Sequence, residues 1–235
     1  MVAPVLRRVV LPLTAPVGSV RSVRWDGVVL TYDDGPQPGG TDKVLAALAE
    51  YGSTATFFLL VGRARRHPAL LREIVDAGHE IALHGVDHVR LTTLSPAVVR
   101  RRTRDGRREL EDLAGRPVRW FRPPYGAQHP STWAAIRSVG LESVVWSSDV
   151  ADWQDDPVDA IAARSAAVGT GSVLLMHDGY ADSFDGVDDG PAPGFDRGDL
   201  SRRVLGSLGE RGLATSSLRD ALAAGSAVRG AWFRG

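Results

Sequence analysis

Two adjacent carboxylates, Asp33 and Asp34, stand at the end of a short apolar run and directly before Gly35-Pro36. Residues 27–30 have the composition of a buried strand, and the Gly-Pro pair ends it. Because successive strand residues point to opposite faces, the two carboxylates can do different jobs close together. A solvated Asp-Gly-Pro turn is the alternative, but it needs only one aspartate. We therefore predict that a metal ion binds one carboxylate and leaves its neighbour as a base.

Two histidines, His84 and His88, follow a predicted strand at residues 79–83. If that segment turns helically, imidazoles four residues apart point to one side and can chelate one ion. With Asp34 they form a two-His, one-Asp set that suits zinc or another divalent transition metal and leaves positions open for water and substrate. The spacing alone fits two surface histidines equally well, and it is the aspartate pair that favours the metal site. Asp87 is expected to be only a solvated neighbour.

Further polar and aromatic residues follow the later predicted strands. The planar guanidinium of Arg122 can hold a carboxylate base ionised and oriented, although it could also be an ordinary surface arginine. Asp152 can raise the pKa of His177 so that this histidine donates a proton to a leaving group. Taken by itself, His177 is better explained as an ordinary histidine at the end of a strand. Trp153 is either a core aromatic or a wall against a sugar ring. Tyr125 likewise could be a core aromatic or a wall against a sugar ring, or it could offer its backbone N–H to an oxyanion.

Strand patterns alternate with amphipathic helical patterns from residue 26 onward, in seven βα units. The predicted strands lie at residues 27–30, 54–60, 79–83, 118–121, 141–146, 172–176 and 213–215. The predicted helices lie at 41–51, 68–77, 95–114, 131–139, 157–168, 200–211 and 218–224. This alternation predicts an α/β fold with parallel strands inside and helices outside, a seven-unit barrel or else a doubly wound open sheet. The polar residues all fall at carboxyl ends of strands, the face where active sites of parallel barrels assemble.

Composition excludes several kinds of site and partner. The 235 residues carry 28 basic and 28 acidic side chains, and this balance disfavours a broad surface for nucleic acid or anionic membrane. The absence of cysteine excludes thiolate nucleophiles, disulfides and zinc–cysteine sites. Residues 1–24 are predicted to form an extended lead-in to a single domain at 25–235. The apolar stretch after Arg7-Arg8 is too short for a signal-peptide core or a membrane span.

In this order the residues resemble the motifs of the polysaccharide deacetylases with a NodB-homology domain, carbohydrate esterase family four. The family patterns T-F-D-D-G-P, H-S/T-x-x-H, R-x-P-Y, D-x-x-D-W and L-x-H are matched by residues 31–36 (with Tyr32 for Phe), 84–88, 122–125, 149–153 and 175–177. The resemblance implies a distorted (β/α)7 barrel. It also implies metal-dependent hydrolysis of an N-acetyl, sometimes O-acetyl, group on a sugar polymer, with one divalent ion, zinc or alternatively cobalt.

Carried over by position, the resemblance implies a role for each matching residue. The implied roles are base for Asp33, metal ligands for Asp34, His84 and His88, tuning of the base for Arg122, acid for His177, setting the pKa of that acid for Asp152, and substrate binding for Leu175, Trp153, Pro123 and Tyr125, the last through its amide.

Two features depart from a plain member of that family. Gly85 stands where the family usually has Ser or Thr, whose hydroxyl helps hold the histidine loop. Losing such support can lower metal affinity or activity about ten- to a hundredfold unless a neighbour substitutes for it. The ligands are intact, so we expect catalysis to persist. Residues 178–196, rich in Asp, Gly and Pro, either shape a substrate rim or form a solvated insertion, and they do not match a calcium loop.

The expected activity is deacetylation of an acetylated carbohydrate of the chitin-oligosaccharide or peptidoglycan type. An O-acetyl (xylan-type) esterase or another amidohydrolase on the same scaffold is the alternative, followed by a non-catalytic carbohydrate-binding protein, for which Gly85 is the only hint. No nucleic-acid partner and no integral membrane association are expected, and the oligomeric state is open. Most family members act outside the cytoplasm, whereas this chain shows no export signal and would be cytoplasmic as it stands.

Overall fold

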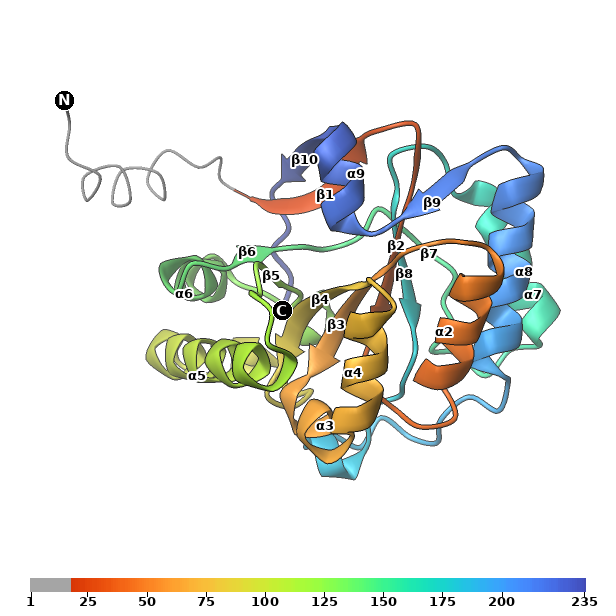
Figure 1. The fold of residues 1–235 in the computed structure, drawn as a ribbon. Helices are drawn as coiled ribbons and strands as arrows, with labels where there is room; N and C mark the ends of the chain where they lie inside the picture. The colour runs from red at the N-terminus through yellow and green to blue at the C-terminus, as the bar shows by residue number, and fades with distance from the viewer. Residues whose placement is uncertain (1–17) are drawn as a thin grey trace.

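The computed structural model describes residues 18–235, and its centre is a curled sheet of parallel strands (Figure 1). Seven strands follow one another in the order β6-β5-β4-β3-β2-β8-β7, and β9 pairs with the first part of β2. Their bounds are β2 Gly27–Asp33, β3 Thr56–Leu60, β4 Glu80–Gly85, β5 Trp120–Phe121, β6 Glu142–Ser143, β7 Ser148–Asp149, β8 Val173–His177 and β9 Ala214–Ser216. The predicted α/β fold, a distorted barrel of parallel strands, is confirmed.

The helices cover the outer side of the sheet, except α9, which lies beside β1 and β10 and packs on the inner core (Figure 1). They are α2 Thr41–Glu50, α3 Val61–Arg66, α4 Pro68–Asp76, α5 Pro96–Ala114, α6 Pro130–Ser138, α7 Val158–Ala163, α8 Arg197–Glu210 and α9 Leu218–Ala224. Helix α5 starts where the Ser95 hydroxyl accepts the N–H of Val98, and it ends at Gly115, whose φ of 62° is a left-handed cap. Helix α3 was not predicted, because it begins directly after β3 with no loop signal between them.

Strand β2 is the centre of the sheet, and all seven of its residues are buried. Both faces are apolar because helices cover one side and the barrel interior the other. Leu30 and Tyr32 belong to the core under the helices, whereas Val29 belongs to the inner core with Phe58. In the register of the sheet, Asp33 lies opposite Phe58 of β3 and His177 of β8. The aspartate at the end of β2 is therefore a direct neighbour of the histidine at the end of β8.

The single fifth strand predicted at residues 141–146 is wrong. Only Glu142–Ser143 of that range is a strand, β6, and β7 follows at Ser148–Asp149, at the other end of the strand order. Because Ser143 and Ser148 are five residues apart, these edges lie at most about 18 Å from each other. A flat sheet of seven strands would span roughly 29 Å, so the sheet must curl until its edges nearly meet. The crossing segment bonds to several strands in turn: Val144 N to Phe121 O, Val145 N to Val20 O and Ser147 N to Val173 O.

A separate antiparallel pair, β1 Ser19–Arg24 and β10 Ser226–Gly230, lies beside α9 (Figure 1). The sequence analysis placed residues 19–24 in the lead-in before the domain. Val20 and Val23 are nevertheless buried in the inner core with Trp120. The predicted lead-in residues before position 18, including Arg7-Arg8, lie outside the described residues.

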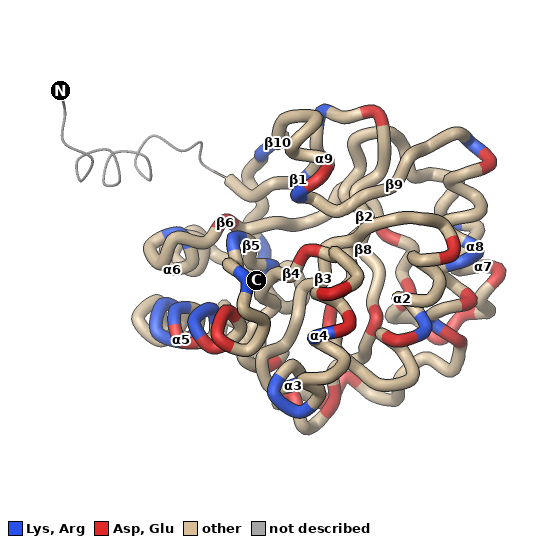
Figure 2. Tube along the Cα trace, in the orientation of Figure 1, with Lys and Arg blue, Asp and Glu red and all other residues tan. Residues whose placement is uncertain are grey.

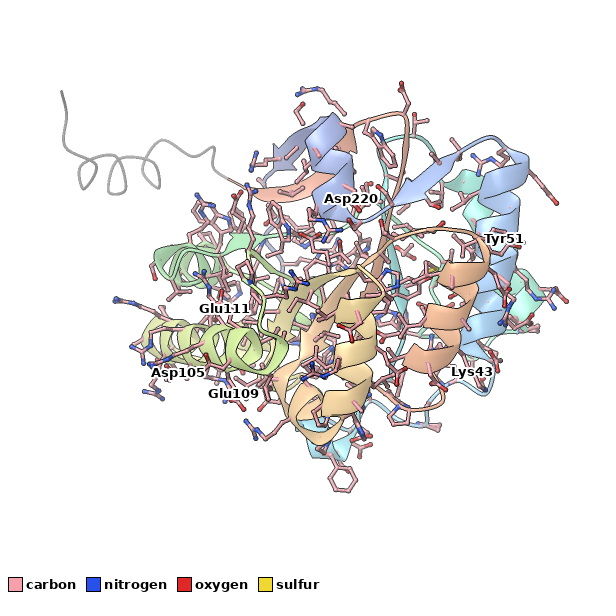
Figure 3. All side chains as sticks on the ribbon, in the orientation of Figure 1. Lys43, Tyr51, Asp105, Glu109, Glu111 and Asp220 are labelled. Atoms are coloured by element: carbon pink, nitrogen blue, oxygen red, sulfur yellow. The ribbon has the colours of Figure 1, made fainter. Side chains whose placement is uncertain are left out.

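Charged residues are spread over the outer helices, and Figure 2 shows both basic and acidic positions along α5. Ion pairs join neighbouring helices: Lys43 on α2, labelled in Figure 3, lies 2.7 Å from Asp196 at the N-cap of α8. Glu50 of α2 accepts two hydrogen bonds of 2.8 Å from Arg202 of α8. None of the helices within residues 18–235 combines the length and apolar character needed to cross a bilayer.

The packing of β1 makes Val20 a test of whether this strand belongs to the folded domain. We expect Val20→Ala to lower the free energy of unfolding by about 2 kcal/mol, because it leaves a cavity in the inner core. Urea unfolding followed by tryptophan fluorescence measures this change. Arg24→Ala, on an exposed position of the same strand, is the control and should change stability little. Equal effects of the two substitutions would show that β1 does not stabilise the domain.

Candidate active site

The carboxyl ends of the parallel strands surround one cavity of about 440 Å³, a size usual for small-molecule sites. The predicted residues that line it are Asp33, Asp34, His84, His88, Tyr125, Trp153, Leu175 and His177. The sequence analysis missed the other lining residues, Gly126, Trp146, Tyr180, Ala181, Asp189 and Arg234. Three predicted site residues, Arg122, Asp152 and Pro123, are buried and do not line the cavity. The first two can act on a substrate only through the residues they contact.

Asp33 is held by a buried ion pair. Arg122 Nη1 donates to Asp33 Oδ1 at 2.7 Å and to Thr31 Oγ1 at 2.9 Å. The guanidinium is wholly buried and lies 4.0 Å from the centre of the Phe58 ring. Burial lowers the pKa of Arg122, while the Asp33 charge opposes that change. The pair occupies Oδ1 of Asp33, and Oδ2 remains near the histidines, 3.8 Å from His84 Nε2.

The structure brings the three predicted metal ligands together. Asp34 Oδ1 lies 3.4 Å from Nε2 of His84 and 3.4 Å from Nε2 of His88. Two ligand atoms about 2.1 Å from a tetrahedral zinc ion lie about 3.4 Å apart, so this spacing fits one ion. Asp34 Oδ1 is buried and has no hydrogen-bond partner among the described residues, as a ligand oxygen awaiting a cation would be. The donor set therefore fits a divalent transition metal.

Protonation in the triad also suits metal binding. His84 Nδ1 donates to the main-chain oxygen of Arg122 at 2.8 Å, so its Nε2 keeps the free lone pair. Burial lowers the pKa of His88, with partial opposition from Asp34, and this favours the neutral imidazole that a metal requires. Burial acts to raise the pKa of Asp34, but positive charge on the neighbouring histidines, His88 above all, outweighs burial and holds the pKa of the carboxyl well below its usual range. With both imidazoles neutral, a bound metal ion would supply that positive charge.

His177 stands across the cavity in a hydrogen-bonded chain of buried groups. Its Nδ1 lies 2.7 Å from Asp152 Oδ1, and its main-chain N–H donates to Asp152 Oδ2 at 2.8 Å. Arg197, which the sequence analysis missed, donates to the same Oδ2 at 2.9 Å. Burial acts to lower the pKa of His177, but the Asp152 carboxylate outweighs it and raises the pKa to about 9. Nδ1 is thus engaged, and Nε2 is the nitrogen left for a substrate.

Aromatic side chains form the cavity wall. Trp153 is 40% exposed and lies edge-on to His177, with ring centres 5.9 Å apart. Tyr125 has a left-handed backbone, with φ of 60°, and its ring lies 4.4 Å from that of His88. Its hydroxyl donates to Asp189 at 2.6 Å. Trp146 packs on Trp232 of the C-terminal segment, which brings Arg234 to the rim.

Two residues of the histidine segment behave as follows. Asp87 is outside the triad, as predicted, but it is not merely solvated: it is partly buried and pairs with Arg102 at 2.5 Å. Gly85 has φ of 145°, and a Cβ added there would lie 2.6 Å from the main-chain oxygen of Asp87. A serine or threonine would therefore strain this backbone, so Gly85 is required by the local conformation.

The sequence of this chain is similar to those of known proteins. The family model described as polysaccharide deacetylase matches residues 22–144. The chain belongs to the polysaccharide deacetylase family. A chitooligosaccharide deacetylase of Sinorhizobium fredii is 38% identical over 154 residues, covering 65% of this chain and 72% of the relative. A peptidoglycan-N-acetylglucosamine deacetylase of Bacillus cereus is 32% identical over 158 residues, covering 66% and 74%.

Solved structures agree with this membership. A family 4 carbohydrate esterase from Streptomyces lividans, solved in complex with acetate, has a TM-score of 0.72 and 29% identity. The similarity covers 88% of this chain and 100% of the esterase. Most of the described chain is thus arranged as in that polysaccharide deacetylase family member, including the parts outside residues 22–144.

Metal binding is the first test of the site. We expect the purified protein to bind one zinc ion per chain, and His84→Ala or His88→Ala to lower the zinc affinity by at least about a hundredfold, since each removes one of three ligands. Titration of metal-free protein with zinc measures both quantities. Asp87→Asn is the matched control, because it removes a charge in the same segment but outside the triad. Unchanged affinity in the histidine variants would disprove the site.

The Asp152–His177 pair makes a second prediction. In metal-free protein, His177 should titrate near pH 9, and Asp152→Asn should lower its pKa because the partner that stabilises the imidazolium is gone. The pair's contribution to stability should be full below pH 6.5, the usual histidine pKa, and disappear as pH rises through about 9. NMR titration of the imidazole measures the pKa. A higher or unchanged pKa in Asp152→Asn would contradict the assigned cause.

Proposed function

We propose that the protein is a metal-dependent hydrolase that removes N-acetyl groups from an N-acetylated sugar polymer or oligosaccharide of the chitin or peptidoglycan type. One observation carries this proposal: three kinds of group line a single cavity. They are the Asp33 carboxylate with one free oxygen, the possible metal ligands Asp34, His84 and His88, and the His177 imidazole, whose pKa is raised. Family membership supports the reaction type, and the two relatives named above support the substrate class.

The three ligands Asp34, His84 and His88 would hold the ion. A bound divalent ion would supply a Lewis acid that polarises the acetyl carbonyl and lowers the pKa of water. Asp33, held by Arg122, accepts the proton from the attacking water as the water oxygen adds to the carbonyl carbon. The main-chain N–H of Tyr125 donates to the oxyanion that this addition creates.

The second half of the reaction breaks the carbon–nitrogen bond. His177 donates the proton on Nε2 to the sugar nitrogen as the electron pair of that bond returns to the nitrogen. The products are acetate and a free amino sugar. Asp33 and His177 lie opposite each other in the register of β2 and β8, so base and acid flank the same scissile group. Arg122 and Asp152 are positioning residues, because they act through Asp33 and His177.

The aromatic wall supports a carbohydrate substrate. Trp153 presents a half-exposed face beside His177, where the apolar face of a pyranose ring can stack. Leu175 lines the same cavity from β8, two residues before His177, and is suited to the acetyl methyl group. A polar acetamido group then meets the triad while the ring lies on the tryptophan.

Acetate release tests the proposal directly. Zinc-loaded protein should release acetate from N-acetylglucosamine oligomers or peptidoglycan fragments faster than from acetylated xylan. Faster release from xylan would replace the proposal by an O-acetyl esterase. Binding of a glycan without acetate release from any of these substrates would replace it by a carbohydrate-binding protein.

The acid and base roles make a prediction about turnover. Asp33→Asn and His177→Ala should each lower kcat about 10²–10⁴-fold while the zinc content stays at the wild-type value. Asp87→Asn and His129→Ala remove the same kinds of side chain elsewhere and serve as controls. Zinc content and melting temperature measured on the same samples separate a chemical role from misfolding. Near-normal turnover in either active-site variant would refute its assigned role.

A further inference from the structure

The two metal-ligating imidazoles differ in how their second ring nitrogen is supported. His84 Nδ1 is bonded to the main-chain oxygen of Arg122. His88 Nδ1 is buried and has no hydrogen-bond partner among the described residues. A ligating histidine almost always donates its other N–H to a carboxylate, carbonyl or water, which fixes the ring and raises its basicity. The ligand set is therefore incomplete at His88.

Residue 85 cannot supply the missing partner. It is a glycine with a left-handed backbone and no room for a side chain, because a Cβ would approach Asp87 O within 2.6 Å. The support for His88 must come from another segment.

The acidic loop at residues 178–196 is fastened directly to the histidine segment. The main-chain N–H of His88 donates to the main-chain oxygen of Asp185 at 2.9 Å. The Asp185 side chain is only 1% exposed and accepts hydrogen bonds from Arg63 Nε at 2.8 Å and from Arg66 at 3.0 Å. Arg63 also donates to the main-chain oxygen of Tyr180 at 2.6 Å. A buried ion pair thus fixes this loop over His88.

Four residues after Asp185, the same loop places a carboxylate beside the unpaired nitrogen. Asp189 Oδ2 lies 3.8 Å from His88 Nδ1, about 1 Å beyond hydrogen-bond distance. The same oxygen accepts the hydroxyl hydrogen of Tyr125 at 2.6 Å, and the Tyr125 ring packs on the His88 ring. Tyr180 donates its hydroxyl to the main-chain oxygen of Asp189 at 2.9 Å. Tyr125 thus holds the carboxylate of Asp189, and Tyr180 its main chain, next to His88.

We propose that Asp189 is the positioning residue for His88, accepting the Nδ1–H hydrogen bond when His88 ligates the metal ion. This inference rests on the metal site of the proposed function. It makes the loop at 178–196 part of the metal site and gives it the supporting role that residue 85 cannot have. Asp188, the preceding residue, is exposed and makes no ion pair or side-chain hydrogen bond among the described residues, so it provides a matched control.

Zinc affinity of the metal-free protein tests the proposal. We expect Asp189→Ala to weaken zinc binding about ten- to a hundredfold, the usual effect of removing a partner of a ligating histidine. Asp188→Ala removes the same charge one residue away and should stay within about threefold of wild type. Competition with a chromophoric chelator measures all three dissociation constants. The metal-free variants should have the melting temperature of metal-free wild type, which separates support of a ligand from support of the fold.

A second measurement reports on the bond itself. In zinc-loaded wild type the His88 Nδ1–H proton should give an NMR resonance protected from solvent exchange, and Asp189→Ala should abolish that protection while Asp188→Ala retains it. Equal zinc affinities in Asp189→Ala and Asp188→Ala, with the protected resonance retained, would overturn the role of Asp189 and leave the proposed function intact. Failure of wild type to bind zinc would instead overturn the metal site itself.

Discussion

The buried ion pair between Arg122 and Asp33 is the interaction on which the placement of Asp33 and of the neighbouring candidate metal-binding triad depends. The guanidinium fixes the carboxylate of Asp33, while the main-chain oxygen of the same arginine fixes the imidazole of His84. Removing an arginine and a carboxylate from water costs several kcal/mol per ion, and good geometry with additional hydrogen bonds is needed to offset this. The bonds from Nη1 to Asp33 and Thr31 provide part of that compensation. One residue directly after β5 thereby positions Asp33, the proposed base, and His84, a proposed metal ligand, together.

Neighbouring carboxylates in this site are distinguished by their partners. Asp33 faces an arginine, and Asp34 faces two imidazoles. A third carboxylate, Asp178, lies behind them, completely buried, and accepts a hydrogen bond from the Thr41 hydroxyl at 2.5 Å. Burial, reinforced by the charge of Asp34, raises the pKa of Asp178 to about 7. Like charges crowded this closely cannot all remain ionised at no cost, so each carboxylate has its own means of compensation.

The two sides of the cavity are built differently. Asp33, Asp34, His84 and Arg122 lie at or directly after the ends of β2, β4 and β5, whose positions the sheet hydrogen bonds determine, whereas His88 lies in the bend after β4. The rim comes from loops and the C-terminal segment: Tyr125 and Asp189 lie beside His88, and Arg234 lies against Trp146 and Trp232. A fixed reactive edge with a rim of loops suits an enzyme scaffold, because the chemistry stays constant while the rim can change with the substrate.

The fold class, and the gathering of most candidate site residues at one cavity, could be predicted from sequence because their signals are local. A buried strand pattern followed by polar residues recurs at Asp33, His84, Arg122 and His177, and parallel strands bring such ends to one edge. The helix at 95–114 was equally clear, since its N-cap serine and C-terminal glycine adjoin it. The family pattern then assigned roles to these positions.

The rest was decided only by tertiary structure. β1 pairs with β10 some two hundred residues later, and the crossing between β6 and β7 depends on how far the sheet curls, so neither leaves a local periodicity. Arg197 and Asp189 reach the site from helix α8 and a loop, and their spacing from the other site residues carries no pattern. The sequence determined which residues could do the chemistry, because residue type and strand-end position are local properties. Folding decided which partners hold those residues, because such contacts join segments far apart in the chain.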